Sequence, residues 1–224
     1  MTLALVTGAS RGIGRATAVG LAQRGVDLVL VGRPSPQLSD TVEACAAVKV
    51  VIEPCDLADA AELGRVAERV LSHAVPDVLI HNAGIIHRAR IEDTTATSFD
   101  EQISVNLRAP FLLTRAFLPA LRARGSGRIV NVGSISSTLG SPGAAAYAAS
   151  KWGLVGFTKS LALELTDTGL SAVVVLPGSV ETDMLVGSGF SPRMGADDVA
   201  KTLVHYALDA PLAHNGAVIE MFGT

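Results

Sequence analysis

Tyr147 and Lys151 are the two side chains whose types and spacing best suit proton transfer. Residues four apart lie on the same face of a helix. A free phenol has a pKa of about 10, which is too high for efficient proton exchange at neutral pH. A nearby ammonium group stabilises the phenolate and lowers that pKa. The pair therefore predicts an acid/base unit, with a chance helical spacing as the alternative.

A glycine-rich loop follows the first apolar run of the chain. It reads Thr7-Gly8-Ala9-Ser10-Arg11-Gly12-Ile13-Gly14. Glycines allow a tight turn and a close approach of the backbone, and the helix that follows directs free N–H groups at an anion. The first two glycines are farther apart than in the usual dinucleotide fingerprint. The loop predicts a phosphate site, with an ordinary glycine turn as the alternative.

Two arginines indicate which dinucleotide would bind there. An NAD-binding fold typically carries an acid at the end of the second strand, where it meets the ribose hydroxyls. This chain has Arg33 at that position, and Arg11 lies on the glycine loop. Guanidinium groups hold a 2′-phosphate through charge-assisted contacts. NADP(H) is therefore favoured over NAD(H), and solvated surface arginines are the alternative.

The elements that must position these residues alternate between strands and helices along the whole chain. Alternation of this kind predicts βαβ units. We expect an α/β fold with a Rossmann-type doubly wound parallel sheet of about seven strands, helices on both faces and one domain over residues 1–224. The expected strands are Leu3–Thr7, Asp27–Val31, Val48–Ile52, Asp77–Ile80, Arg128–Val132, Leu170–Leu176 and Val218–Met221. The expected helices are the run from the glycine loop to Ala22, then Leu38–Ala46, Ala60–His73, Phe99–Arg124, Tyr147–Leu165 and Ala196–Ala207.

Composition narrows the classes of function. The net charge of −3 argues against nucleic acid as a partner, because phosphate binding needs a basic face. The apolar runs are short and interrupted, so no membrane span is expected despite a positive mean hydropathy. Cys45 and Cys55 lack metal-ligand spacing and are expected to be reduced and buried. No targeting signal is visible, so the cytoplasm is the expected location, and no metal site is expected.

Taken together, the motifs resemble those of the short-chain dehydrogenase/reductase family, in the family's order and at its spacing across nearly the whole chain. The matching pieces are Thr7-Gly8-x-x-x-Gly12-Ile13-Gly14, Asp56-Leu57, Asn82-Ala83-Gly84, Asn106, Ser134, Tyr147-x-x-x-Lys151 and Pro177-Gly178-x-Val180-x-Thr182. The resemblance implies an oxidoreductase that moves a hydride reversibly between nicotinamide C4 and a carbonyl or secondary-alcohol carbon.

The resemblance also implies roles for four catalytic residues. Tyr147 would be the general acid in reduction and the base in oxidation, and Ser134 would polarise the substrate oxygen. Lys151 would bind the nicotinamide ribose and lower the pKa of Tyr147. Asn106 would hold a water that links Lys151 to solvent. A residue at a helix bend is the alternative for Asn106.

A larger set would bind the cofactor. Asp56 would meet the adenine, with a helix cap as its alternative, and Asn82 would meet the adenosine side. Val180 and Thr182 would meet the carboxamide and phosphates. The full set is Gly8, Ser10, Arg11, Gly12, Ile13, Gly14, Arg33, Asp56, Leu57, Asn82, Ala83, Gly84, Tyr147, Lys151, Pro177, Gly178, Val180 and Thr182.

Some positions depart from the family's commonest pattern. His81 replaces the first asparagine of the Asn-Asn-Ala-Gly motif, a change that bears on structure more than chemistry. The segment Met184–Gly195, which corresponds to the lid over the substrate, is short. A short lid suggests an open pocket and leaves the substrate unassigned.

The substrate stays open between a 3-oxoacyl thioester and a small carbonyl compound or polyol. Arg122, Arg124 and Arg128 could dock an acidic carrier protein, but Thr168 stands where carrier-protein reductases often have a basic residue. Arg88 and Arg90 could instead meet an anionic small substrate, with a solvated loop as the alternative. A non-catalytic NADP-binding regulator is the competing function, although such a protein would be expected to lose Ser134, Tyr147 or Lys151.

Two helical regions carry more apolar residues than one buried face requires. They are Ala109–Leu121 and Trp152–Leu165, with Phe111, Phe117, Phe157 and Leu161 among them. The resemblance implies that these helices pair across two-fold axes, which would give a homodimer or homotetramer. The alternative is that the extra residues cover the sheet.

Overall fold

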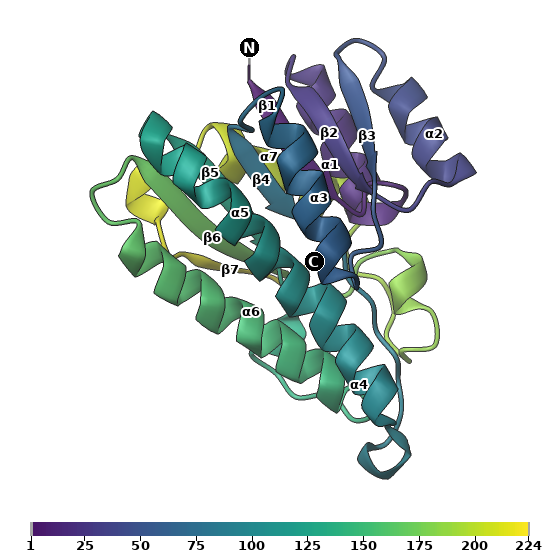
Figure 1. Ribbon diagram of the computed structural model, residues 1–224. Coiled ribbons are helices and arrows are strands. Elements are labelled where there is room, and N and C mark those ends of the chain that lie inside the picture. The colour runs from purple at the N-terminus through teal and green to yellow at the C-terminus, as the bar shows by residue number, and fades with distance from the viewer. Residues whose placement is uncertain (1, 224) are drawn as a thin grey trace.

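The computed structural model describes residues 2–223, and within them seven strands form one parallel sheet (Figure 1). The strand order is β3-β2-β1-β4-β5-β6-β7, and every neighbouring pair is parallel. The strands are β1 (Leu3–Thr7), β2 (Asp27–Gly32), β3 (Val50–Pro54), β4 (Val78–His81), β5 (Gly127–Val132), β6 (Leu170–Pro177) and β7 (Val218–Met221). The prediction of a doubly wound parallel sheet is confirmed.

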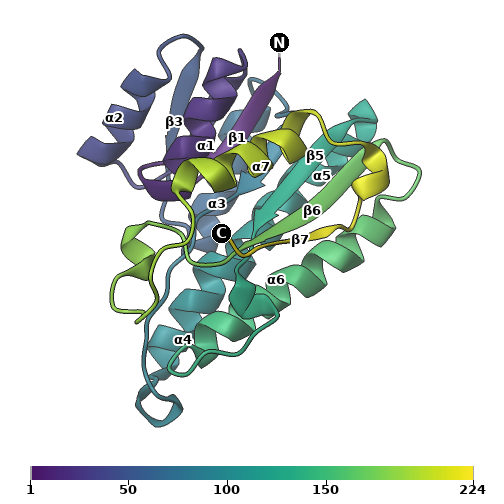
Figure 2. The same cartoon turned by 180° about the vertical axis from the view of Figure 1, so that it is seen from behind.

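Helices cover both faces of this sheet. Helices α3, α4, α5 and α6 lie on the face seen in Figure 1, and α1, α2 and α7 lie on the face seen in Figure 2. Their bounds are α1 (Gly12–Gln23), α2 (Pro36–Ala44), α3 (Ala60–Leu71), α4 (Ala96–Ile103), α5 (Ala109–Arg124), α6 (Ala145–Glu164) and α7 (Ala196–Leu208). No helix of residues 2–223 is both long enough and apolar enough to cross a bilayer.

The apolar strands divide their side chains between two cores. In β1, Ala4 and Val6 join the core under α1 and α7, whereas Leu5 joins the core under α3 and α5. Successive side chains of a strand point to opposite faces of the sheet, so a strand covered on both faces must be apolar at every position. All eight residues of β6 are buried for this reason.

Several predicted element boundaries are displaced by one to three residues, and the starts of α2 and β3 have a visible physical cause. Helix α2 begins at Pro36 because the Ser35 hydroxyl caps it by accepting from Leu38 N at 3.2 Å, and proline suits the first helical position. Strand β3 starts at Val50, which pairs with Leu28 of β2, so the predicted start at Val48 was two residues early. Pairing with β2 fixes this start, and the apolar run alone could not.

The predicted helix Phe99–Arg124 is not one regular helix. It begins earlier, at Ala96, and passes through a π-helical segment, η2 (Ser104–Arg108), before α5. The Ala109 N–H donates to the Ser104 carbonyl five residues back, a wide turn that is frequently found at functional sites. The π segment contains Asn106, which is fully buried.

His81, the departure from the family's motif, is a buried neutral histidine at the end of β4. Its Nε2 lies 3.0 Å from the Thr114 hydroxyl of α5, and its Nδ1 has no hydrogen-bond partner among residues 2–223. Burial lowers the pKa of His81 from 6.5 to about 3. The charged form is disfavoured because the surrounding core cannot solvate it.

We predict that His81 makes the fold less stable in acid. Its folded-state pKa of about 3 lies below the unfolded value of 6.5. The unfolded chain therefore binds more protons between these values, and stability is lost as the pH falls from 6.5 toward 3. The loss is about 2 kcal/mol between about pH 8 and about pH 5. His81→Asn should remove this part of the pH dependence. Urea unfolding of both proteins at the two pH values measures it, and equal acid sensitivity would contradict the prediction.

Candidate active site

The candidate residues gather where the parallel strands end. Thr7 ends β1, His81 ends β4, Val132 ends β5 and Pro177 ends β6, and these four strands are neighbours in the sheet. Ligands of such sheets bind outside the carboxyl ends of the strands, at the point where the strand order reverses. Here that point lies between β1 and β4, directly after which come the glycine loop and Asn82-Ala83-Gly84.

The glycine loop is pressed against the segment that follows β4. Gly8 has a φ of +69°, and a Cβ on it would lie 2.8 Å from the Ala83 Cα. A Cβ on Gly14 would collide with the Gly8 carbonyl and the Asn82 amide. Both positions therefore require glycine, Gly8 for its backbone conformation and both for the close approach.

Asn82 fixes the backbone of the glycine loop through hydrogen bonds. Its Nδ2 donates to the carbonyls of Thr7 and Gly8, both at 3.0 Å. In return, the Thr7 hydroxyl accepts the N–H groups of Asn82 and Ala83, both at 3.1 Å. Asn82, expected to meet the adenosine side of a cofactor, thus has its amide committed to the loop.

The start of α1 fits a phosphate group. No side chain caps the helix, because Arg11 at the N-cap position makes no such bond and the first turn holds no acid. Its first N–H groups have no intrahelical acceptor and carry the positive end of the helix dipole. Ser10 precedes the N-cap residue, and Gly12 and Ile13 are the first two residues of the helix. The donor set suits a dinucleotide's phosphates.

The two arginines predicted to read a 2′-phosphate have different surroundings. Arg33 follows β2, is exposed, and forms no ion pair or side-chain hydrogen bond within residues 2–223. It lies two residues beyond Val31, whose carbonyl accepts from Gly8 N at 3.1 Å. Arg11 forms an exposed ion pair with Asp183, 3.2 Å between Nη1 and Oδ2. The loop arginine thus already has a carboxylate partner, and Arg33 does not.

Asp56 and Leu57 follow β3, next to the end of β2. The Asp56 carboxylate accepts from Ala58 N at 2.9 Å, and its own N–H donates to Glu62 at 2.6 Å. Asp59, not Asp56, caps α3. Leu57 is buried while Asp56 is exposed, so the Asp56 carboxylate closes a turn at the surface. Both residues lie after the end of β3, an edge strand, and three strands separate β3 from β5, near whose end Tyr147 lies.

Ser134, Tyr147 and Lys151 meet at the end of β5. Ser134 follows the strand and its hydroxyl accepts from Ser136 N at 3.1 Å. Tyr147 lies in the first turn of α6 and is buried, and its hydroxyl lies 3.9 Å from the Met184 sulfur. Lys151 is also buried, with Nζ donating to the Val132 carbonyl at 2.8 Å and lying 5.8 Å from the Tyr147 ring centroid.

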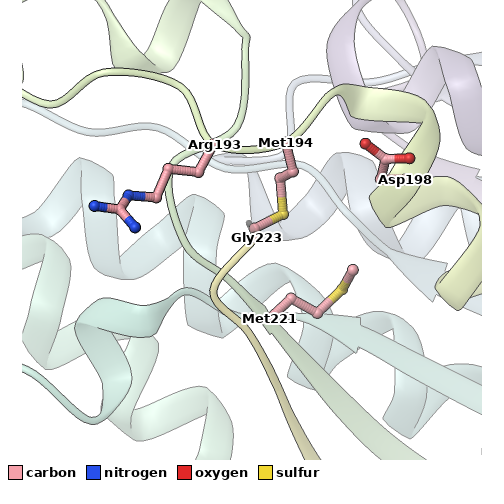
Figure 3. Close-up of a pocket in the computed structure, with 5 residues that line it drawn as sticks. All are labelled: Arg193, Met194, Asp198, Met221 and Gly223. Atoms are coloured by element: carbon pink, nitrogen blue, oxygen red, sulfur yellow. The ribbon is translucent and has the colours of Figure 1, made fainter.

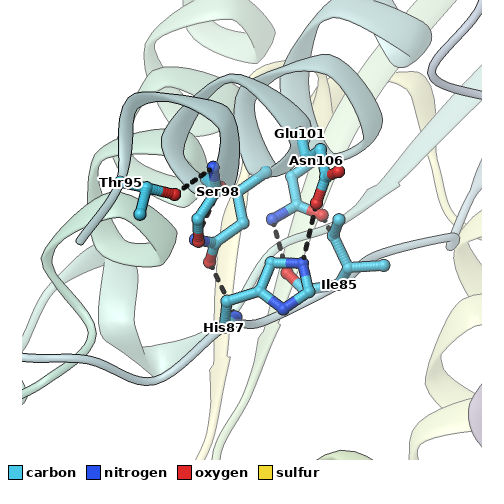
Figure 4. Close-up of polar contacts among 7 residues, drawn as sticks. Ile85, His87, Thr95, Ser98, Glu101 and Asn106 are labelled. Carbon is cyan, nitrogen blue, oxygen red and sulfur yellow. Dashed lines mark hydrogen bonds and ion pairs between the residues drawn. The ribbon is translucent and has the colours of Figure 1, made fainter. Parts of the chain in front are cut away.

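Asn106 in the π segment is fixed by three hydrogen bonds. Its Oδ1 accepts from Ile85 N at 2.8 Å and its Nδ2 donates to the Ile85 carbonyl at 2.9 Å (Figure 4). The Nδ2 also donates to the Ser150 hydroxyl at 3.0 Å. A Cβ on Gly84 would lie 3.3 Å from Asn106 Oδ1 and 3.4 Å from Lys151 Nζ. Gly84 therefore lies against both the amide and the ammonium group, and a side chain at this position would crowd them.

Burial shifts both titrating groups of the site. It raises the pKa of Tyr147, and the Ser134 hydroxyl and the Arg88 charge oppose the rise. It lowers the pKa of Lys151 to about 8. The sequence predicted that Lys151 would lower the pKa of Tyr147. In the structure burial dominates instead, because the phenol is removed from water while the ammonium lies beside the ring face.

The segment that follows β6 contacts the end of the glycine loop through Thr182. Val180 is buried and pairs with Met194 in an isolated parallel bridge, and Gly178 N donates to the Met221 carbonyl at 2.8 Å. A Cβ on Gly12, whose φ is +53°, would lie 3.1 Å from the Thr182 methyl group. Residues Pro177 to Thr182 therefore lie against the same loop that Asn82 supports.

Sequence reasoning missed two contributors to this site. Ser150 links Asn106 to α6, since its hydroxyl also donates to the Tyr147 carbonyl at 2.7 Å. Its position three residues after Tyr147 on a helix was the available signal. Met184 contacts the Tyr147 hydroxyl, and only its place at the start of the lid pointed to it.

A separate hollow lies between the last residues of the lid, the start of α7 and the chain around the end of β7. Its lining consists of Arg193, Met194, Asp198, Met221 and Gly223, with Arg193 and Asp198 at opposite sides (Figure 3). It contains none of the residues predicted to act in catalysis. Among residues 2–223, no three His, Cys, Asp or Glu side chains are grouped so as to hold a metal ion.

Comparisons with known proteins agree with these features. Residues 2–189 match the family described as short chain dehydrogenase. The chain is 35% identical over 231 residues to a 3-oxoacyl-[acyl-carrier-protein] reductase from Synechocystis sp., covering 99% of this chain and 86% of that protein. It is 37% identical over 187 residues to a D-beta-hydroxybutyrate dehydrogenase from Cupriavidus necator, covering 81% and 72%.

Two solved structures of oxidoreductases are similar to this chain over nearly its whole length. A provisionally assigned NAD(P)-dependent gluconate 5-dehydrogenase from Beutenbergia cavernae, with NADP bound at low occupancy, is similar with a TM-score of 0.89 and 34% identity. That similarity covers 98% of this chain and 94% of that one. Levodione reductase is similar with a TM-score of 0.92 and 29% identity over 99% and 96% of the two chains.

Proposed function

This chain belongs to the short-chain dehydrogenase/reductase family, whose enzymes use a nicotinamide cofactor, and we propose that it is an NADP(H)-dependent oxidoreductase of carbonyl compounds and secondary alcohols. The observation that carries the proposal is the meeting of Ser134, Tyr147 and Lys151 at the end of β5, beside the phosphate-binding loop. We treat residues 1–224 as one domain that contains both parts of the site.

In the proposed mechanism the bound nicotinamide supplies or accepts the hydride, and Tyr147 moves the proton. In reduction the Tyr147 hydroxyl donates to the substrate oxygen, and in oxidation the phenolate accepts the proton back. The raised pKa of Tyr147 keeps the phenol protonated at neutral pH, which suits the reducing direction. The Ser134 hydroxyl polarises the substrate oxygen.

Lys151 and Asn106 support this proton transfer. Lys151 is proposed to bind the nicotinamide ribose hydroxyls with the N–H groups that Val132 does not engage. A pKa of about 8 lets its ammonium exchange protons near neutral pH. Asn106 holds the backbone of Ile85 on one side and Ser150 on the other, so we propose that it positions α6 as well as any water beside Lys151.

The remaining sequence-predicted cofactor residues are proposed to bind the dinucleotide along the same edge. The glycine loop and α1 would hold the phosphates, Asp56 and Leu57 the adenine, and Val180 with Thr182 the carboxamide end. Arg33 would bind the 2′-phosphate of NADP(H), and Arg11 would assist where it can leave Asp183. NADP bound in the related gluconate 5-dehydrogenase structure supports this preference.

A small carbonyl compound or polyol is a better substrate proposal than a carrier-bound thioester. The sequence offered Arg122, Arg124 and Arg128 as a possible docking patch for a carrier protein. They lie at the amino end of β5, whereas Tyr147 lies beyond the carboxyl end of that strand. Arg124 forms an ion pair with Asp77 at 3.0 Å. Within one chain, these arginines offer no docking surface beside the site. The relatives include both substrate types, since one is a 3-oxoacyl reductase and another a hydroxybutyrate dehydrogenase.

The competing proposal is a non-catalytic regulator that binds NADP(H). The presence of Ser134, Tyr147 and Lys151 in one cluster argues against it. Consumption of NADPH with a simple diketone would exclude it.

We keep the cytoplasm as the proposed location because Cys45 and Cys55 are buried free thiols, as is usual in a reducing compartment. Cell fractionation tests this location.

We predict that the protein is a homodimer or homotetramer. Phe117 and Leu161 prove to be buried within one chain, so they cover the sheet and need no partner. Phe111 on α5 and Trp152 on α6 remain 47% and 53% exposed, and apolar surface of this kind favours association. Light scattering at micromolar concentration should give a multiple of 23.0 kDa, and a monomeric mass would contradict the prediction.

Tyr147→Phe should lower turnover by about 10²–10⁴, the usual contribution of a positioned acid/base group. The ring and the surrounding pocket are kept, so NADPH affinity should change little. Lys151→Ala should damage both turnover and NADPH binding, since it removes a buried cation that contacts the Val132 carbonyl. Steady-state kinetics and fluorescence titration separate the two effects. Near wild-type turnover in Tyr147→Phe would refute the proposed mechanism.

Arg33→Asp should reverse the cofactor preference. A hydrogen bond to a charged group contributes about 1.5–3 kcal/mol, so losing the guanidinium should cost about tenfold to a hundredfold in NADPH selectivity. The new carboxylate would also repel the 2′-phosphate and accept the ribose hydroxyls of NADH. The measurement is kcat/KM for both cofactors in both proteins. An unchanged NADPH/NADH ratio would show that Arg33 does not read the phosphate.

A further inference from the structure

The loop between β4 and α4 carries three basic residues, of which two already have carboxylate partners. His87 Nε2 lies 3.3 Å from Glu101 Oε2 (Figure 4). Arg90 Nε lies 3.3 Å from Glu92 Oε1. Arg88 forms no ion pair with any carboxylate of residues 2–223, and the one hydrogen bond of its side chain there goes to the Met184 carbonyl at 3.2 Å. The positive charge of Arg88 is therefore uncompensated.

Arg88 lies beside the proposed proton donor. Met184 contacts both groups, since its carbonyl accepts from the Arg88 guanidinium and its sulfur lies 3.9 Å from the Tyr147 hydroxyl. The phenol and the guanidinium are thus separated by a single lid residue. The charge is close enough to act on the phenol, because it lowers the pKa of Tyr147 against the effect of burial.

A solvated surface arginine is the plain alternative, because Arg88 is exposed. A solvated side chain, however, would not be expected to hold a fixed bond to the lid. The bond to the Met184 carbonyl holds the guanidinium at the residue that also contacts the Tyr147 hydroxyl, and it uses one of five N–H donors. The others can bind an anion.

We propose that Arg88 binds a carboxylate of the substrate, so that the enzyme acts on short oxo acids and their hydroxy-acid counterparts. One uncompensated guanidinium matches the single charge of a carboxylate, and its planar fork fits the two oxygens. A phosphate monoester carries nearly two charges, and the loop offers no second unpaired cation. This inference rests on the proposed oxidoreductase function and specifies its substrate class.

The separation between Tyr147 and Arg88 limits the length of the carbon chain between the two functional groups of the substrate. The reacting carbonyl must lie at the Tyr147 hydroxyl while the carboxylate reaches past Met184 to Arg88. The two functional groups are therefore joined by a short carbon chain. The separation is best found with a series of oxo acids in which only the chain length changes.

The experiment compares acids with their isosteric neutral amides. The substrates are 3-oxobutanoate, 4-oxopentanoate and 5-oxohexanoate, each paired with its primary amide, with NADPH as reductant. The proteins are wild type, Arg88→Gln, Arg88→Lys and, as the control on the same loop, Arg90→Gln. For at least one chain length the wild type should prefer the acid. Arg88→Gln should lower the acid/amide ratio of kcat/KM about tenfold to a hundredfold, the size expected for a charge-assisted hydrogen bond, mainly through KM.

The other variants test the fork geometry. Arg88→Lys keeps the charge but loses the fork, so its ratio should fall between those of wild type and Arg88→Gln. Arg90→Gln should keep the wild-type ratio. Equal losses on acid and amide in Arg88→Gln, or a raised KM for NADPH alone, would overturn the proposal in favour of a role in the lid or in cofactor binding. So would a wild type without acid preference at any length.

Two further measurements distinguish a failure of the carboxylate assignment from a failure of the proposed oxidoreductase function. Arg88 dependence that appears with dihydroxyacetone phosphate but with none of the oxo acids would overturn the carboxylate assignment. Failure of wild type to reduce any acid, amide or simple diketone would count against the oxidoreductase itself. In that case calorimetric titration with 5-oxohexanoate in the presence of NADP⁺ still tests Arg88, because binding that Arg88→Gln does not weaken would overturn the inference.

Discussion

The hydrogen bond from Lys151 Nζ to the Val132 carbonyl, 2.8 Å long, is the interaction on which the rest of the site depends. It joins α6, which carries Tyr147, to the strand whose end carries Ser134. A buried ammonium group is costly unless its donors are used, and the cost appears here as a pKa lowered to about 8. Burial, which disfavours the charged form of the lysine, also raises the pKa of Tyr147 and so keeps its phenol protonated.

Two hydrogen-bond networks, each built around an asparagine and a hydroxyl side chain, hold the backbone around this bond. Asn82 and Thr7 lock the glycine loop to the segment after β4 through four hydrogen bonds between 3.0 and 3.1 Å. Asn106 ties Ile85 to Ser150 and so connects the same segment to α6. The wide π turn is what brings the Asn106 amide into this contact. Such side-chain amides replace water as partners of loop backbone groups, which would otherwise remain unsatisfied.

The charges around the site are divided between its two ends. At the end near β2, Arg33 has no ion-pair partner within residues 2–223, whereas Arg11 is paired with Asp183. At the end near Tyr147, Arg88 has no carboxylate partner in the same described range and contacts the lid at Met184. Asp183 directly precedes Met184, the first residue of the lid, so one short segment contacts Arg11 on the glycine loop through Asp183 and Arg88 through Met184.

The sequence by itself determined the layered sheet and the identity of the central residues. The apolar runs of strands such as β1, whose side chains alternate between two cores, follow from local chain geometry, which residue type specifies. The glycines at positions 8 and 14 and the Tyr147–Lys151 spacing follow from it as well. Only the tertiary structure decided where those side chains find partners. It committed Asn82 to the loop, raised the pKa of Tyr147, and placed Arg128 at the far edge from the site while Arg88 came beside it. Hydrogen-bond partners and electrostatic environments depend on residues brought together from distant parts of the chain, and no spacing along the sequence encodes that proximity.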